Sequence, residues 1–476
     1  MQFFLLVMIN FKSLNKNFLW EYISYFILFI YLIYAILFAF ERILNIDNSF
    51  FLFEIINRGT FILPEKRYGN WLSQLPVLIF LKLKFNLETL IYVFSISFPL
   101  LYLFIIWLCH AVFDNKPAAL AAILSLITGV GFSFFHPVTE THQALAYSAL
   151  LYAIINFKGF TNTAWKYYLI SVIGYAWCLL THPAAVFTCL FVLLISVIKR
   201  ENKKRHFILF LIILTLLAAA ARFFFSDETS YDNQQYSKLL GYENTLFKFF
   251  ELYAIKYFII KWKTIYLAPI ILIFSVFVYG IINKKFTELV IAFICFLVFF
   301  IISILTFYTG ESDAMMEKSF MPGIFMPVFI FSIFFYEDGK AKSLTRYSLL
   351  ACLVISFIEI AVVSFQFSDR LNYLEKISKY QTSHNKPKLI ANFSDFNESV
   401  LQPNSWATGI DMLMLSLTKH TASNTLFLTN DKYNFNFDKN DTTLFLCVSW
   451  APYWNVKKLN RKYFKLSDQT YQTYKQ

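Results

Sequence analysis

The sequence predicts an all-α polytopic membrane protein of about eleven transmembrane helices, followed by a small α+β domain. Of its 476 residues, 58% are hydrophobic and only 15% are charged, whereas soluble domains contain about 45–50% apolar and about 25% charged residues. The apolar residues gather in runs long enough to cross a bilayer. Residues 367–476 lack such runs and are instead rich in Asn, Asp and Lys.

The candidate spans are the apolar runs of the first 366 residues, taken at the length that a bilayer requires. They cover residues 18–40, 89–112, 117–135, 142–157, 167–181, 183–198, 206–225, 264–282, 287–307, 320–336 and 345–366. Several are short, notably 142–157 and the two that meet at "LLTHPAAV". We expect such helices to end beside protein or a water-filled cavity, because their terminal backbone groups need partners.

The basic residues predict the orientation of these spans. The short connections "DNKP", "KGFTNTAWK", "KRENKKRH", "NKK" and "EDGKAKSLTR" carry Lys or Arg, whereas "HPVTETH" and "THP" carry none. The positive-inside rule therefore predicts a cytoplasmic N-terminus and three larger outer segments, 41–88, 226–263 and 367–476. The net charge of +12 is explained by these connections, so nucleic acid is not an expected partner. The expected location is a bacterial inner membrane with a periplasmic C-terminal domain.

The C-terminal segment has the pattern of a small folded unit. It begins with the helical pattern "DRLNYLEKISKY" and continues through "KPKLIANF", "NTLFLTN" and "TTLFLCVSW", which have the pattern of short strands. The chain is therefore divided into a transmembrane domain, 1–366, and an extracytoplasmic α+β domain, 367–476.

The first outer loop, 41–88, contains two candidate interfacial helices, "FFLFEIIN" and "WLSQLPVLIFLKL". Asp47 begins this loop and has two interpretations, a general base or an N-cap residue. Glu54 is a second catalytic candidate or a solvated side chain. The loop is either a platform for a lipid-linked ligand or a packing element.

Basic and imidazole side chains on the same predicted face could bind a phosphate. The candidates are Arg58, Arg67, His182 and Arg222, with Glu140 and His142 of "HPVTETH" at the rim of a sugar-phosphate cavity. For each Arg, the alternative is interaction with lipid headgroups. Pro137 is expected at the first position of the helix that carries Glu140.

The sequence does not decide whether the protein binds a metal ion. Two acidic pairs, Glu311 with Asp313 and Asp227 with Glu228, could bind Mg²⁺ or Mn²⁺ or could be ordinary loop residues. The spacing H-x₃-E-x-H in "HPVTETH" lacks a second ligand pair for zinc. The sequence does not contain the motifs of nucleotide-binding P-loops, dinucleotide-binding folds, metalloproteases or α/β-hydrolases. These protein classes are therefore not expected.

Four features together resemble the GT-C superfamily of membrane glycosyltransferases, which includes protein O-mannosyltransferases and lipid A aminoarabinose transferases. Asp47 follows the first span, Glu140 precedes the fourth, "THP" joins two short spans, and an outer domain closes the chain. The resemblance implies transfer of a sugar from a polyprenyl phosphate to a lipid, glycan or protein acceptor. It implies a base at Asp47 and phosphate binding by Arg58, Arg67 or Arg222. Members often carry an acidic pair in the first loop, whereas here Asn48 follows Asp47.

Two other functions are compatible with the sequence. A transporter or flippase would need ionisable groups along a path through the membrane, for which Glu359 and His110 are the main candidates. A GT-C-like scaffold without catalytic activity would instead present its C-terminal domain to envelope proteins. A cavity beneath the first outer loop, with Asp47 facing Arg or Lys, would favour the enzyme.

Overall fold

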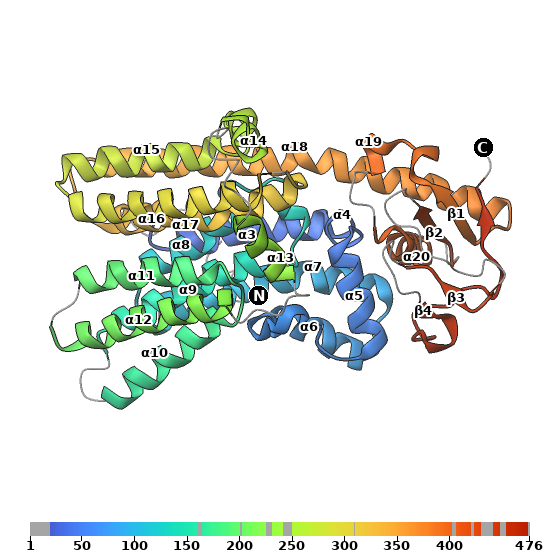
Figure 1. The fold of residues 1–476 in the computed structure, drawn as a ribbon, viewed down its shortest axis with the longest axis horizontal. Coiled ribbons are helices and arrows are strands. Elements are labelled where there is room, and N and C mark those ends of the chain that lie inside the picture. Colours follow the sequence, from blue (N-terminus) through green and yellow to red (C-terminus); the bar gives the residue numbers. More distant parts are fainter. Residues whose placement is uncertain are drawn as a thin grey trace, which may run out of the picture.

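The computed structural model describes residues 20–159, 164–199, 202–224, 231–240, 250–308, 310–401, 406–419, 423–429, 441–447 and 454–474. These residues form a helical bundle and a smaller C-terminal domain, joined by one long helix, α18 (Figure 1).

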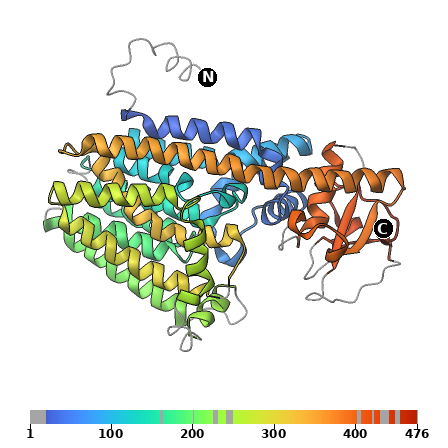
Figure 2. The ribbon, with the colours of Figure 1, turned by 90° about the horizontal axis from the view of Figure 1, so that it is seen from above.

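The first part of the bundle contains the elements that position the site. In chain order they are α3 (Ile23–Leu37), α4 (Ala39–Ile43), α5 (Asp47–Arg58), α6 (Trp71–Lys82), α7 (Leu87–Trp107), α8 (Lys116–Ile127), η5 (Phe132–Phe135) and α9 (Glu140–Asn156). Helix α5 runs across the direction of α18, between the bundle and the C-terminal domain (Figures 1 and 2). The predicted interfacial helices of the first outer loop therefore correspond to α5 and α6.

The rest of the bundle continues with α10 (Ala164–Leu179), α11 (Ala185–Lys199), α12 (Asn202–Phe224), α13 (Tyr231–Leu240), α14 (Tyr253–Lys261), α15 (Leu267–Ile282), α16 (Phe286–Thr306), α17 (Asp313–Tyr336) and α18 (Lys342–Ser383). Helix α17 lies at the centre, packed against α8, α15 and α16. Its side chains from Phe320 to Phe335 are almost all buried, so the helix is apolar all round.

Among the described residues, five helices are long and apolar enough to cross a membrane. They are Leu87–Val112, Lys204–Phe224, Phe286–Thr306, Asp313–Tyr336 and Lys342–Ser383. Four apolar helices are shorter, at Ile23–Leu37, Lys116–Ile127, Ala185–Ile198 and Leu267–Ile282. The prediction of a mostly helical, apolar protein with a small α+β end is confirmed at this level.

Several helix boundaries differ from the predicted ones, and the ends of α8 and α18 differ most clearly. Helix α8 ends at Ile127, whereas the apolar run predicted a span to residue 135, because Gly129 adopts a left-handed conformation with φ +72°. Helix α18 continues through the predicted domain boundary at 366/367 and is 42 residues long. At 1.5 Å per residue it measures about 63 Å, about twice the thickness of a bilayer core.

The C-terminal domain contains a three-stranded parallel sheet and a helix that covers it. The strands are β1 (Lys388–Asn392), β2 (Thr425–Thr429) and β5 (Gln472–Thr473), in the order β2-β1-β5. A second pair joins β3 (Leu444–Phe445) to β4 (Trp454–Asn455). Helices α19 (Glu398–Leu401) and α20 (Thr408–Lys419) connect β1 to β2. Lys388 is buried, and its ammonium donates to the carbonyls of Thr442 and Leu444.

The C-terminal domain is docked onto α5. The ring of Phe53 on α5 contacts Phe445, Trp454 and Phe464 of the domain. A buried ion pair adds to this junction, because Arg370 of α18 donates to Asp411 of α20 (2.5 Å) and to the carbonyl of Leu44 (2.9 Å). The bundle, α5 and the C-terminal domain are therefore held as one packed structure.

Candidate functional site

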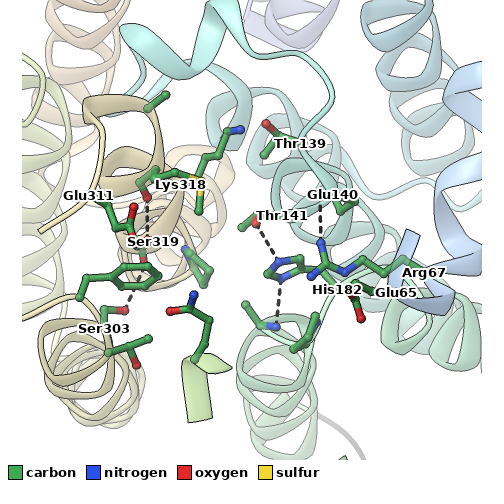
Figure 3. A pocket seen from close by; sticks show the side chains of 18 of the residues that line it. Glu65, Arg67, Thr139, Glu140, Thr141, His182, Ser303, Glu311, Lys318 and Ser319 are labelled. Atoms are coloured by element: carbon green, nitrogen blue, oxygen red, sulfur yellow. Dashed lines mark hydrogen bonds and ion pairs between the residues drawn. The ribbon is translucent and has the colours of Figure 1, made fainter. Parts of the chain in front are cut away.

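A cavity of about 1640 Å³ lies at the end of the bundle that faces the C-terminal domain. Its lining comes from α5, the loop before α9, the turn between α10 and α11, the ends of α12 and α16, α13, the start of α17, Gln366 of α18 and Trp406. Figure 3 shows part of this lining. Most ligand pockets measure about 300–1,000 Å³, so this cavity has room for two substrates.

Asp47 lines the cavity and is not an N-cap. It is the first residue of α5, and the N-cap position is Ile46, which makes no capping hydrogen bond through its side chain. Ile46 has φ +47°, a strained conformation for a β-branched residue. Burial raises the pKa of the Asp47 carboxyl, Glu140 raises it further, and Lys318 opposes the shift. A carboxylate with a raised pKa beside a cation has the properties of a general base.

Asn48 explains why an acidic pair is missing after Asp47. Its amide nitrogen donates to the carbonyls of Arg42 (2.7 Å) and Phe135 (2.9 Å), and its oxygen accepts from the N–H of Val138 (3.2 Å). All three contacts are buried. A carboxylate has no proton to donate, so the position requires an amide.

Residues 131–138 form a loop whose backbone is held by side chains from other elements. Glu317 of α17 accepts from the backbone N–H groups of Gly131, Phe132 and Ser133, at 2.7–3.1 Å. Asn48 holds the other end of the loop. Asn48 is the neighbour of Asp47, and Glu317 is the neighbour of Lys318. The loop therefore fixes the relative positions of Asp47 and Lys318.

The substitution Asn48→Asp is expected to lower the free energy of unfolding by about 1–3 kcal/mol, because two buried carbonyls lose their donor. The measurement is the thermal unfolding midpoint of the purified protein. Asn57→Asp is the matched control on the same helix, since the Asn57 oxygen accepts from the N–H of Asn460 (2.9 Å) and its buried amide nitrogen has no hydrogen-bond partner within the described ranges. Equal midpoints for the two variants would contradict this role of Asn48.

Four of the predicted phosphate-binding and rim residues line the cavity, namely Arg67, Glu140, His182 and Arg222. Arg67 and Glu140 form an ion pair at 3.3 Å that joins the first outer loop to the start of α9. Arg222, at the end of α12, donates from Nη2 to the carbonyl of Leu179 (2.5 Å), while its buried Nη1 has no hydrogen-bond partner among the residues that the structure describes. The Arg222 guanidinium therefore has a donor available inside the structure.

His182 lines the cavity as a neutral imidazole. Its Nδ1 accepts from the backbone N–H of Ala184 (3.1 Å), so the ring proton of the neutral form is on Nε2. Burial holds the pKa of His182 well below its usual value, and Arg67 and Arg222 lower it further. Nε2 lies 3.5 Å from Oγ1 of Thr141 (Figure 3). His182 can therefore donate a hydrogen bond but cannot act as a cationic acid near neutral pH.

Lys318 is the main residue of the cavity that was not predicted as a site residue. It lies on the second turn of α17, lines the cavity and makes no hydrogen bond or ion pair with any residue in the described part of the chain. The predicted span began at residue 320, which left Lys318 in a loop. The sequence "ESDAM" carries the signal that could have found it, since Ser312 and Asp313 are typical of a helix start.

Glu54, Arg58 and His142 lie outside this cavity. Glu54 is buried, pairs with Arg58 and accepts from Nε1 of Trp454 (3.0 Å), so it joins α5 to the C-terminal domain. Arg58 is more than half exposed. His142 is buried against a much smaller hollow lined by Tyr102 and Pro137. Helix α9 begins at Glu140, so Pro137 is not its first residue.

The candidate metal ligands are already engaged with cations. Glu311 pairs with Lys238 at 3.5 Å, and Asp313 pairs with Lys261 at 3.3 Å. In the described ranges, no group of three His, Cys, Asp or Glu side chains is arranged to hold a metal ion. The other acidic pair, Asp227 and Glu228, lies outside the described residues.

The cavity thus combines several carboxylates, of which Asp47 is one, with cationic or neutral donors and an apolar wall. The wall comes from α11, α12 and α16 and contains Val186, Phe187, Ala219, Phe223, Phe299 and Ile302. Such a site can bind an anionic head that carries a hydrocarbon tail and can remove a proton from a second molecule. Comparison of this chain with protein-family models, with characterised proteins and with solved structures finds no match.

Proposed function

We propose that the protein is a glycosyltransferase that moves a sugar from a polyprenyl phosphate to an acceptor hydroxyl, as a member of the GT-C superfamily would. The observation that carries this proposal is the placement of Asp47 and Lys318 in one large cavity, each next to a residue that is bonded to the same loop. A base and a phosphate-binding cation are the two groups that such a transfer needs.

The cavity has an apolar part and a polar part, and this arrangement supports a lipid-linked donor. The apolar wall formed by α11, α12 and α16 suits an isoprenoid chain, and Arg222 lies where that wall meets the polar region. Arg222, Lys318 and the Nε2–H of His182 supply donors for the phosphate oxygens. Arg67 is held by Glu140 and borders the same region (Figure 3).

The chemical step is a displacement at the anomeric carbon. Asp47 accepts the proton of the acceptor hydroxyl while the hydroxyl oxygen of the acceptor forms a bond to the anomeric carbon. The bond from the carbon to the phosphate oxygen breaks, and the electron pair leaves with the phosphate, whose charge Lys318 and Arg222 stabilise. Attack opposite to the leaving group inverts the configuration. The phosphate is already a good leaving group, so orientation supplies much of the rate.

The expected placement follows from the same proposal. All eleven predicted spans would cross a bacterial inner membrane, the N-terminus would be cytoplasmic, and the C-terminal domain would be periplasmic, where envelope proteins are possible partners. The cavity would then open on the outer face.

The alternatives lack comparable support. A transporter would need ionisable groups along its path. The His110 ring contacts the rings of Tyr22 and Tyr25 near the start of α3, whereas Asp47 follows the other end of that helix. A scaffold without activity has no need for an open cavity lined by charged groups.

Binding of the donor tests the proposal directly. Purified protein in lipid nanodiscs is expected to bind polyprenyl phosphate, and Lys318→Ala and Arg222→Gln are each expected to weaken that binding about tenfold or more, since a charge-assisted hydrogen bond contributes about 1.5–3 kcal/mol. Native mass spectrometry or competition with a labelled lipid gives the affinity.

Arg205→Gln is the matched control, because Arg205 lies exposed at the opposite end of α12. Its affinity should equal that of the unmodified protein. If Lys318→Ala and Arg222→Gln both bind the lipid as tightly as Arg205→Gln does, the phosphate site is not where we propose.

A further inference from the structure

We propose that the part of the cavity between Asp47, Phe51, Gln366 and Trp406 is the acceptor subsite, and that it takes a saccharide. This inference rests on the proposed function and goes beyond it, because it assigns the acceptor class and gives the C-terminal domain a role in the reaction.

The first step is the position of the base. Asp47 must lie beside the acceptor hydroxyl, so the acceptor occupies the region around the start of α5. The proposed donor groups Arg222 and His182 line the region formed by α10, α11 and α12. The cavity volume, about 1640 Å³, exceeds the requirement of one sugar phosphate. Donor and acceptor can therefore be bound together.

The second step is the origin of the walls. Trp406 precedes α20 of the C-terminal domain, and its ring lies edge-on to Phe50 of α5, at 5.5 Å between centroids. Phe50 is one helical turn from Asp47. Phe51, Gln366 and Trp406 all line the cavity. The C-terminal domain therefore supplies an aromatic wall next to the catalytic carboxylate.

The third step is the chemistry of these walls. A sugar ring has apolar C–H faces and a rim of hydroxyl groups, so it is bound by aromatic rings together with amide and carboxylate groups. Trp406 and Phe51 provide the rings. The Gln366 amide makes no hydrogen bond with a residue in the described parts of the chain, so its donor and acceptor atoms are available.

The other acceptor classes fit less well. An extended peptide is often bound along an unpaired strand edge, but no β-strand contributes to the described lining of this cavity. A hydrocarbon chain would need a mainly apolar wall, and the most apolar part of the lining is the one that α11, α12 and α16 form with Val186, Phe187, Ala219, Phe223, Phe299 and Ile302.

The contacts that hold α20, the helix after Trp406, support a role for Trp406 in binding the acceptor. Helix α20 is tied to α18 by the buried pair of Arg370 and Asp411, and Arg370 also holds the carbonyl of Leu44, three residues before Asp47. The same side chain thus holds the element that follows Trp406 and the turn that precedes Asp47.

The experiment uses membranes containing the full chain and a polyprenyl phosphate that carries a radiolabelled hexose. After incubation with envelope material, label is measured in the oligosaccharide, lipid and protein fractions. We expect label in the oligosaccharide fraction. With that fraction as acceptor, Trp406→Ala should raise the acceptor KM at least tenfold, Trp406→Tyr should restore most of the loss, and the donor affinity should stay unchanged.

Trp165→Ala is the control, because Trp165 is an exposed tryptophan at the start of α10. Label in protein or lipid, or an acceptor KM for Trp406→Ala equal to that for Trp165→Ala, overturns the saccharide subsite and leaves the glycosyltransferase standing. Absence of all transfer together with absence of donor binding contradicts the proposed function itself.

Discussion

Asp47→Asn is expected to lower kcat for sugar transfer by about 10²–10⁴-fold, which is the usual contribution of a positioned general base. The amide keeps the size of the carboxylate but cannot accept the acceptor proton. Donor binding should change little, because Arg222, Lys318 and His182 remain. The measurement is transfer from a labelled polyprenyl phosphate sugar under saturating donor.

The same substitution should not destabilise the protein. Burial raises the pKa of Asp47 above its unfolded value, so the contribution of this group to stability is fully present below the unfolded pKa and is lost as pH rises through the folded pKa. At neutral pH the ionised carboxylate thus costs stability, and Asn mimics the neutral form. The unfolding midpoint of Asp47→Asn should equal or exceed that of the unmodified protein.

The pH dependence provides an independent check. Transfer requires ionised Asp47, so kcat/KM should fall as pH is lowered through its pKa, and the acid limb should lie above the usual range of an Asp. Glu54→Gln is the comparison, since Glu54 lies on the same helix but outside the cavity. Full activity in Asp47→Asn, or loss of activity in Glu54→Gln alone, would sink the assignment of the base.

Arg370→Leu is expected to lower the free energy of unfolding by about 3–5 kcal/mol, because it leaves Asp411 as a buried charge without a partner. Both side chains are almost fully buried, at 1% and 0% exposure. The substitution also removes a donor from the carbonyl of Leu44. Thermal unfolding of the purified protein gives the loss, and limited proteolysis should show that the C-terminal domain becomes accessible.

The double variant Arg370→Leu/Asp411→Leu separates the charge from the packing. Removing both charges should recover much of the stability lost in the single variant, since a buried ion pair contributes little net free energy. A double variant as unstable as the single one would show that the contact with Leu44, not the unpaired carboxylate, dominates.

The sequence was informative where a local pattern determines the structure. Hydropathy predicted eleven spans, and a helix overlaps each of these ranges, although only five of the described helices are long and apolar enough to cross a membrane. The runs "KPKLIANF" and "NTLFLTN" predicted β1 and β2. The alternation of the predicted spans placed Asp47, Arg67, Glu140, His182 and Arg222 on one side of the protein. These residues line one cavity.

The sequence was less informative where distant residues determine the structure. The conformation of the loop after α8 depends on Glu317, which lies 184–186 residues along the chain from the three loop N–H groups that donate to it. Glu54 has the position of a catalytic or solvated residue, but its partner Trp454 lies 400 residues further along the chain. The spacing of residues along the sequence cannot predict such long-range contacts. The roles of Lys318, Asn48 and Trp406 could therefore be inferred only from the structure.

The continuity of α18 has a consequence for how the chain can change in length. Each residue added to a helix between the bundle and Arg370 would turn everything beyond it by about 100° and move it outward by about 1.5 Å. A single insertion would therefore point Arg370 away from Leu44 and carry Trp406 out of register with Asp47. Two full turns would nearly restore the phase but would displace the domain by about 10 Å. The number of residues in α18 thus determines both the rotation of the C-terminal domain about the helix axis and the distance of Trp406 from Asp47.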